Sequence, residues 1–402
     1  MKKTAILLIL SLLFSLSACV QAPAPTQSTT VPTVATTAPT TQPTVVTTEP
    51  AMVPVTTAPL ISVSLPTSTE TVYANNGTEI FSYTFQNINL ITQDGDVADL
   101  VIIDFLNRID ATRLTADRIY ALAASAYTGQ SSWQPYMCMI SYAPTRIDPG
   151  VLSLFGTQAG YYGSTHPETV YSAVNYDLVT GLPLSLGDIL QEDATPDMLL
   201  NGVLSDLVSR EKELFLYSDY AATVREHFSG SGIQNSWYFS EEGLCFYFTP
   251  YEIAPYATGV VVACIPYNAL AGILQDAYFP GEQDTANGTL KAIPFSQEAL
   301  SQFQRFTELV QDSDEENILI YTDASVRNLR IETGIWSATG TFYTPQHTIF
   351  AASALSAGDA LMIQAQITQQ NPQLRIRYET DAGTKIFFIT KDDSGKPILK
   401  AQ

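Results

Sequence analysis

The stretch GLCFYFTPYEIAPYATGVVVACIPY, residues 243–267, contains two apolar runs rich in aromatic and β-branched residues, separated by YEIAPYAT. Runs of this composition, bounded by Pro and Gly, are typical of β-strands. Placing Cys245 opposite Cys264 gives a consistent antiparallel register. In that register Phe246 faces Ala263 and Phe248 faces Val261. The stretch therefore predicts two paired strands joined by a long loop.

Two further patterns precede this stretch, and we group all of them in a segment covering residues 176–285. NYDLVTGLPLSLGDIL, residues 175–190, predicts a strand, a tight turn at Thr180-Gly181, a second short strand and the start of a helix. Residues 196–216 carry apolar side chains at helical spacing. We expect one amphipathic helix there.

An earlier segment, residues 67–175, begins with TEIFSYTFQNINLI, which predicts a strand. A helical pattern starts at Val97 and is expected to end between Arg108 and Ala111. Residues 135–177 then contain several short alternating runs separated by Gly and Pro. Such runs are typical of a meandering antiparallel sheet.

The last segment, residues 286–402, begins with apolar positions that predict a helix over residues 296–310. Six candidate strands with Gly turns follow, which favours a small β-sandwich. The whole chain is therefore expected to be an α+β protein. Its antiparallel sheet with packed helices precedes a small, mostly-β, sandwich-like domain.

The first residues have the pattern of an export signal. Lys2 and Lys3 precede the apolar run AILLILSLLFSL, and Leu16-Ser17-Ala18-Cys19 follows it. This pattern resembles a bacterial lipoprotein signal peptide. The alternative, a transmembrane anchor, is disfavoured because the apolar run is too short to span a membrane. The resemblance implies removal of residues 1–18, lipidation of Cys19, and anchoring at the extracytoplasmic face of the cell membrane.

Residues 19–66 are almost entirely Thr, Pro, Ala, Val and Gln, with Glu49 as their one charged residue. Frequent Pro removes backbone donors, and the stretch has no apolar periodicity to bury. We predict a disordered tether that separates the membrane anchor from the folded part. The composition leaves open whether the tether is glycosylated.

The pair Cys245 and Cys264 has two interpretations. In an extracytoplasmic compartment two cysteines in this register are a candidate cross-strand disulfide. Alternatively, both are free and pack as small hydrophobic side chains, which is the interpretation we favour. Cys138, within YMCMISY, is expected in the core.

Residues 243–267 also carry a family resemblance. The order of an aromatic strand, Pro-Tyr-Glu-Ile-Ala-Pro-Tyr, a Gly and a second apolar strand resembles the extracellular domain of RsiV-type anti-sigma factors, which also accompanies PdaC-type peptidoglycan deacetylases. NYDLVTGLPLSLGDIL and, more weakly, GYYGSTHPET at residues 160–169 resemble the same domain. Together these matches span roughly residues 75–285, with a PdaC-type subdomain to residue 175 and an RsiV-type subdomain after it.

The resemblance implies a binding role in the cell envelope. RsiV-type domains bind lysozyme, so the expected partner is a lysozyme-like basic protein or peptidoglycan. The expected binding residues lie in the loop: Pro250, Tyr251, Glu252, Ile253, Pro255 and Tyr256. Two Pro residues would stiffen the loop and present its tyrosines at low entropic cost, and Glu252 is expected to lack a nearby cation. The alternative is that the loop is only a structural corner.

The net charge excludes one class of partner and favours another. The chain carries 19 Lys and Arg against 40 Asp and Glu, a formal charge of −21. Nucleic-acid binding needs a basic surface, so we exclude it. No Lys or Arg occurs between Arg225 and Lys291. An acidic surface would attract a basic protein.

No catalytic residue, metal ligand or cofactor is predicted. The acidic groups Asp94, Asp96 and Asp99, and Asp312, Asp314, Glu315 and Glu316, do not match a calcium loop and are expected to be solvated turns. The only His of residues 286–402 is His347, which cannot supply the His pair of a deacetylase. His166 and His227 are expected to be surface or core residues.

Two other functions stay open. An enzyme of wall metabolism could use two carboxylates that are distant in sequence. A structural or assembly lipoprotein could bind other envelope proteins through its C-terminal sandwich. The expectation we carry forward is a non-enzymatic, surface-anchored binding module.

Overall fold

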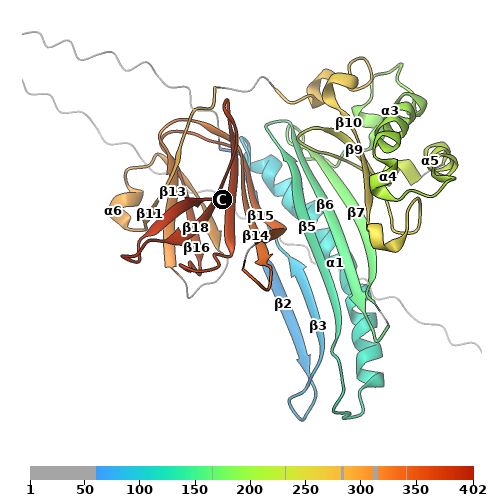
Figure 1. Ribbon diagram of the computed structural model, residues 1–402, viewed down its shortest axis with the longest axis horizontal. Helices are drawn as coiled ribbons and strands as arrows, with labels where there is room; N and C mark the ends of the chain where they lie inside the picture. The colour runs from blue at the N-terminus through green and yellow to red at the C-terminus, as the bar shows by residue number, and fades with distance from the viewer. Residues whose placement is uncertain (1–59, 165, 231, 282–284, 311–315, 341) are drawn as a thin grey trace, which may run out of the picture. The chain divides into compact units, whose positions relative to one another are not determined.

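The computed structural model describes residues 60–402, except 165, 231, 282–284, 311–315 and 341 (Figure 1). The predicted signal peptide, the lipidation site Cys19 and most of the predicted tether lie outside the described residues. The described part is mostly β, with several antiparallel and mixed sheets and few helices. This agrees with the α+β class in its general form. None of the helices in this part is long and apolar enough to cross a membrane.

A five-stranded sheet with strand order β2-β3-β5-β6-β7 is covered by one long helix. Its elements are β2 Thr67–Tyr73, β3 Glu79–Gln86, α1 Gly95–Ala126, β5 Tyr136–Ile147, β6 Val151–Tyr161 and β7 Glu168–Asp177. Strands β5, β6 and β7 form the predicted antiparallel meander, whereas β3 and β5 are parallel. Figure 1 shows α1 running along these strands.

Helix α1 continues well beyond the end that the sequence predicted near Arg108 to Ala111. It runs to Ala126 because Ala116, Ile119 and Ala123 continue its buried face. Two of these three residues are alanines, so the apolar periodicity of this part of the helix is weak in the sequence. The side chain of Asp94 accepts a hydrogen bond from the N–H of Asp96 and so caps the helix start.

The segment that contains the sequence motifs folds as a three-stranded sheet with helices packed on it. Its elements are α2 Leu186–Ile189, α3 Pro196–Ser209, α4 Glu211–Leu214, α5 Tyr220–Ser229, β8 Trp237–Phe239, β9 Gly243–Phe248 and β10 Val261–Pro266, with 3₁₀ turns at Gly232–Asn235, Tyr256–Thr258, Tyr267–Ala269 and Asp276–Tyr278. The single helix predicted over 196–216 is instead two helices, α3 and α4, separated at Arg210.

The predicted turn at Thr180-Gly181 is present, and Gly181 has a φ of +75° that favours glycine. The second short strand after it is reduced to one bridge, between Tyr176 and Pro183. Ser185 and Asp188 then form a capping box that starts α2. The predicted turn and helix start in this stretch are therefore confirmed, and the predicted second strand is present only as a bridge.

Two sheets that share one hydrophobic core form the predicted sandwich. The four-stranded sheet has order β11-β13-β16-β12, with β11 Leu290–Pro294, β12 Arg305–Val310, β13 Glu316–Thr322 and β16 Asp359–Ala365. The seven-stranded sheet has order β19-β18-β17-β14-β15-β1-β4, with β1 Ser62–Ser64, β4 Asn89–Ile91, β14 Val326–Trp336, β15 Tyr343–Leu355, β17 Leu374–Thr380, β18 Gly383–Lys391 and β19 Pro397–Ala401.

The helix predicted over residues 296–310 is wrong. Only α6, Gln297–Leu300, is helical, and residues 305–310 form β12. Thr307 and Leu309 are buried on alternate positions, while Phe306 and Val310 are exposed. Parallel pairing with β16 determines this outcome.

Two predicted boundaries also need correction. Residues 60–65, which we assigned to the tether, belong to the fold: β1 lies between β15 and β4, and Ile61, Val63 and Leu65 are buried. The sandwich is therefore not confined to residues 286–402. It takes β1 and β4 from the N-terminal part of the chain, which connects the predicted segments into one body.

Candidate functional site

The hairpin of β9 and β10 has the register that the sequence predicts. Cys245 is paired with Cys264, and Phe248 with Val261. The two cysteines form a disulfide, so the interpretation that we favoured, two free thiols, is wrong. Cys138 is free and buried, as expected for a core residue. Every residue of β9 is buried, so the hairpin is a rigid base for its loop.

The middle of the loop is anchored in the core. Ile253 and Ala254 are almost completely buried and pack in the same cluster as Phe246 and Phe248. The carbonyl of Ile253 accepts a hydrogen bond of 3.0 Å from the N–H of Tyr217. Ile253, which we predicted as a binding residue, is therefore inaccessible to a partner and has a structural role.

The side chain of Glu252 makes its contacts within the protein. Its Oε2 accepts hydrogen bonds from the N–H of Thr249 at 2.8 Å and from the Thr249 hydroxyl at 3.2 Å. Its Oε1 lies 2.9 Å from Nδ1 of His227. Partial burial disfavours the charged carboxylate, but these hydrogen bonds and the His227 ring outweigh it and lower the pKa of Glu252. This contact between Glu252 and the His227 ring was not predicted from the sequence.

Tyr251 and Tyr256 are the exposed part of the loop. Their side chains are 62% and 40% exposed, and their rings stack with centroids 5.5 Å apart. The ring of His166, from the β6–β7 connection, lies 4.9 Å from that of Tyr256. We call these three side chains the aromatic ledge. His166 escaped the sequence analysis as a site residue because it lies far from the loop in sequence.

The backbone fixes both tyrosines of the ledge. Tyr251 has a φ of +72°, which is uncommon for a residue with a side chain, and its N–H donates to the carbonyl of Ala254 at 3.0 Å. Pro255, with φ of −60°, leads into the 3₁₀ turn that carries Tyr256. Pro250 and Pro255 are half-buried. They therefore support the ledge more than they contact solvent.

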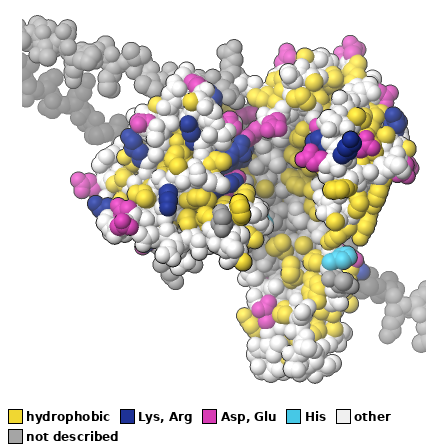
Figure 2. All heavy atoms as spheres, in the orientation of Figure 1, with side chains coloured by type: hydrophobic (Ala, Val, Ile, Leu, Met, Phe, Trp, Pro, Cys, Tyr) yellow, Lys and Arg dark blue, Asp and Glu magenta, His cyan; other side chains and the backbone are white. Residues whose placement is uncertain are grey.

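The helix beside the ledge has a small acidic excess. The Thr258 hydroxyl donates to the carbonyl of Leu214 at 3.3 Å, which places α4 beside the loop. This helix exposes Glu211, Lys212 and Glu213, so it carries one more acidic than basic side chain, and the next residue, Phe215, is 72% exposed. On the face drawn in Figure 2, many Lys and Arg side chains lie over the C-terminal strands, and others lie over the part that contains α3, α4 and α5.

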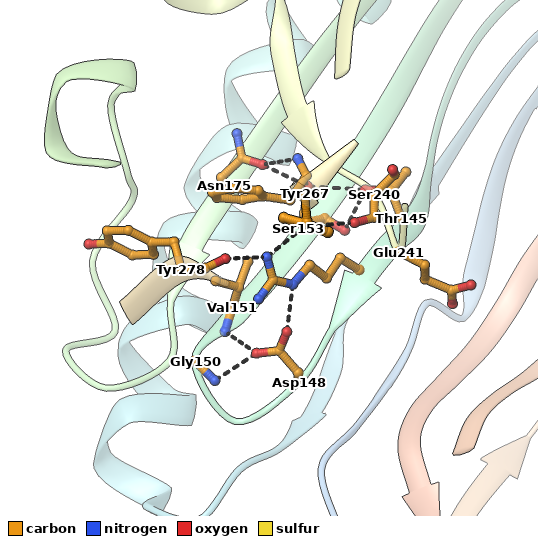
Figure 3. Close-up of polar contacts among 12 residues, drawn as sticks. Thr145, Asp148, Gly150, Val151, Ser153, Asn175, Ser240, Glu241, Tyr267 and Tyr278 are labelled. Carbon is orange, nitrogen blue, oxygen red and sulfur yellow. Dashed lines mark hydrogen bonds and ion pairs between the residues drawn. The ribbon is translucent and has the colours of Figure 1, made fainter. Parts of the chain in front are cut away.

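A buried polar cluster below β9 and β10 is structural (Figure 3). Arg146 is 3% exposed; its Nε donates to Asp148 at 2.5 Å, and its Nη1 donates to the Tyr267 hydroxyl and the Tyr278 carbonyl, each at 2.7 Å. Burial raises the pKa of Tyr267 to about 12 despite Arg146 beside it. The bonds connect the end of β5 and the turn after it to the segment after β10. No periodic or local sequence signal indicated this cluster.

The structure describes Asp94, Asp96, Asp99 and Glu316 of the predicted acidic groups. In the described part of the chain, no three His, Cys, Asp or Glu side chains form a cluster that could hold a metal ion. Asp94 caps α1, and Glu316 pairs with Lys391. Asp312, Asp314 and Glu315 lie outside the described residues. His347 lines a small cavity beside β15, away from the ledge.

One known protein family matches a part of the chain. No curated protein matches the chain. A crystal structure of a DUF3298-family member from Bacteroides fragilis is 18% identical, with a TM-score of 0.38, covering 54% of this chain and 94% of that chain. One from Pseudomonas aeruginosa PAO1 has the same identity and TM-score, covering 56% and 99%. Residues 200–268, from within α3 to the turn after β10, form a DUF3298 domain, a family described as a protein of unknown function.

Proposed function

We propose that this protein is a non-enzymatic binding module of the bacterial cell envelope, anchored through Cys19, that binds a cationic wall-active protein such as lysozyme. The observation that carries the proposal is the aromatic ledge. Two stacked tyrosines project from a loop whose core residues, disulfide-linked strands and prolines are fixed. Rigid, exposed tyrosines lose little conformational entropy on binding and are frequent interface anchors.

The electrostatics of the domain support a basic partner. Glu211 and Glu213 are exposed beside the loop with one cation, Lys212, between them, and the long stretch between Arg225 and Lys291 contains no Lys or Arg. A surface with this sign steers a cationic protein toward it and increases the association rate. The resemblance of residues 243–267 to RsiV-type domains points to lysozyme within that class. Binding is therefore expected to weaken as the salt concentration rises.

The test measures lysozyme binding to the purified full chain by surface plasmon resonance at low salt. The variant Tyr251→Asn/Tyr256→Ala removes both rings, and Asn tolerates the positive φ at position 251. We expect at least about tenfold weaker binding, which corresponds to about 1.4 kcal/mol. Tyr73→Ala is the matched control, because Tyr73 is 61% exposed on β2, away from the ledge.

A parallel assay with purified peptidoglycan separates the alternatives. If the wild-type chain does not retain lysozyme at low salt, the proposal fails. If peptidoglycan is retained instead, and the two tyrosine substitutions release it, then the ledge binds glycan and the partner class must be replaced. If the double variant and the Tyr73→Ala control bind lysozyme equally well, the ledge is not the binding site.

A further inference from the structure

The sandwich carries a pocket that is separate from the DUF3298 domain. Its volume is about 600 Å³. Residues from β14, β15, β18 and β19 line it, together with the connection between β16 and β17. Four aromatic side chains line it. Trp336, Tyr343 and Phe388 form its apolar wall, and Phe342, in the connection between β14 and β15, is exposed. A volume of this size is within the usual range for small-molecule sites.

The three rings lie on the outer face of the seven-stranded sheet. Phe387 and Ile389 pack in the core between the two sheets, so the intervening Phe388 points to the opposite face. Phe388 contacts both other rings, with centroids 5.1 Å from that of Trp336 and 5.0 Å from that of Tyr343. These large rings therefore do not fill the sandwich core, and their grouping on the outer face needs another explanation.

Hydrogen bonds hold two of the rings in place. Nε1 of Trp336 donates to the carbonyl of Pro372 at 3.1 Å, and the Tyr343 hydroxyl donates to the carbonyl of Gln373 at 2.8 Å. The guanidinium of Arg375 lies 5.6 Å from the Tyr343 ring centre and is paired with Glu332 at 2.6 Å. The wall is thus preorganised, which lowers the cost of binding a ligand against it.

The rim of the pocket is polar but nearly uncharged. Gln369, Gln370 and Asn371 are exposed on one side, and Gln402 lies on another. Each amide offers both donors and an acceptor. Among the side chains that line the pocket there is no carboxylate, and Lys400 supplies the one charged side chain. Gln369 already donates to Asp393, and Gln402 accepts from Arg375. An anionic ligand would find one amine, and a purely apolar ligand would make no use of the exposed amides of Gln370 and Asn371.

We propose that this pocket binds a neutral oligosaccharide. A pyranose ring has an apolar C–H face, which packs against aromatic rings, and an edge of hydroxyl groups, which both donate and accept hydrogen bonds. The pocket presents the same two chemistries side by side, with rings on the wall and amides on the rim. This site does not depend on the aromatic ledge, so it stands if the proposed protein partner is wrong.

The test titrates the purified full chain with chitotriose, cellotriose and maltotriose, using calorimetry and tryptophan fluorescence. We expect at least one of these neutral sugars to bind at millimolar concentration, and Trp336→Ala to weaken it at least about tenfold. Because Trp336→Ala could perturb folding, Gln370→Ala/Asn371→Gly provides a second variant. It removes two exposed amides, and Gly accepts the φ of +50° at position 371.

Phe306→Ala is the matched control, since Phe306 is a 46% exposed aromatic on β12 outside the pocket. Its sugar affinity should equal that of the wild type. The proposal is overturned if none of the three sugars binds, or if the pocket variants and the control bind equally. Binding of a sulfated oligosaccharide alone would also overturn it, because Lys400 rather than the amides would then recognise the ligand.

Discussion

Glu252 shows how a residue in the proposed binding loop serves the fold. Its carboxylate holds the Thr249 end of the loop and contacts the His227 ring. In the described part of the chain, Nε2 of His227 is buried without a hydrogen-bond partner. The ring is therefore oriented mainly through its Nδ1. Glu252 is thus better described as the residue that positions the ledge than as part of the binding surface.

This role predicts a pH dependence of stability. The pKa of Glu252 is lowered in the folded state, so its contribution is complete above the ordinary pKa of 4.5 and is lost as pH falls through the folded value. Glu252→Gln should lower the free energy of unfolding at neutral pH. The difference between wild type and variant should shrink below about pH 4.5. Urea denaturation at a series of pH values measures it.

Glu242→Gln is the control for this experiment, because Glu242 is exposed on the turn between β8 and β9. Its stability difference from the wild type should stay small throughout the series. Parallel curves for the wild type and Glu252→Gln across the acidic range would contradict the assigned role of Glu252.

At this scale the sequence indicated only the local half of the candidate site. The two tyrosines were predicted because prolines beside them restrict the chain, a property of neighbouring residues. His166 completes the ledge, and His227 contacts Glu252. Both histidines come from parts of the chain that are distant from the loop in sequence. Contacts between residues that are distant in sequence leave no local pattern, so sequence reasoning could not assign them.

Among the elements, the β9–β10 hairpin was predictable and β12 was not. Both strands of the hairpin carry consistent apolar runs, and the cysteine pair specifies their register. Residues 305–310 fit both a helical and an alternating pattern, as short apolar stretches often do. Pairing with β16, more than fifty residues later, selects the strand. The outcome depends on a partner that the local sequence does not contain.

Strand β1 gives a prediction about the boundary of the folded part. A chain beginning at Leu60 should keep the full free energy of unfolding, because it retains β1. A chain beginning at Thr67 loses Ile61, Val63 and Leu65, whose burial contributes about 1.5–3 kcal/mol each. We expect a loss of at least about 4 kcal/mol. Circular dichroism during urea denaturation compares the two; equal midpoints would show that β1 is dispensable.

For the whole molecule, the important feature is how the sandwich and the DUF3298 domain are joined. Glu241, in the turn between β8 and β9, accepts hydrogen bonds from Arg330 of β14 at 2.5 and 3.0 Å. Arg330 is 5% exposed and also donates to the carbonyl of Pro144 in β5 at 3.2 Å. One buried guanidinium therefore connects three parts of the chain. Arg377 of β17 adds a weaker contact to Glu241 at 3.4 Å.

Because Glu241 of the DUF3298 domain compensates the buried charge of Arg330 in the sandwich, we predict that the sandwich and the DUF3298 domain unfold together. Glu241→Gln leaves Arg330 without its counter-ion, which should cost about 3 kcal/mol, the usual effect of removing one partner of a buried pair. The neighbouring Glu242→Gln is a matched control and should change stability by less than about 0.5 kcal/mol.

Calorimetry should give one transition for the wild type and for Glu242→Gln. For Glu241→Gln we expect a lower midpoint and a broadened or divided transition, since the sandwich and the DUF3298 domain have separate hydrophobic cores. An unchanged profile would mean that other contacts hold the two parts together without the ion pair.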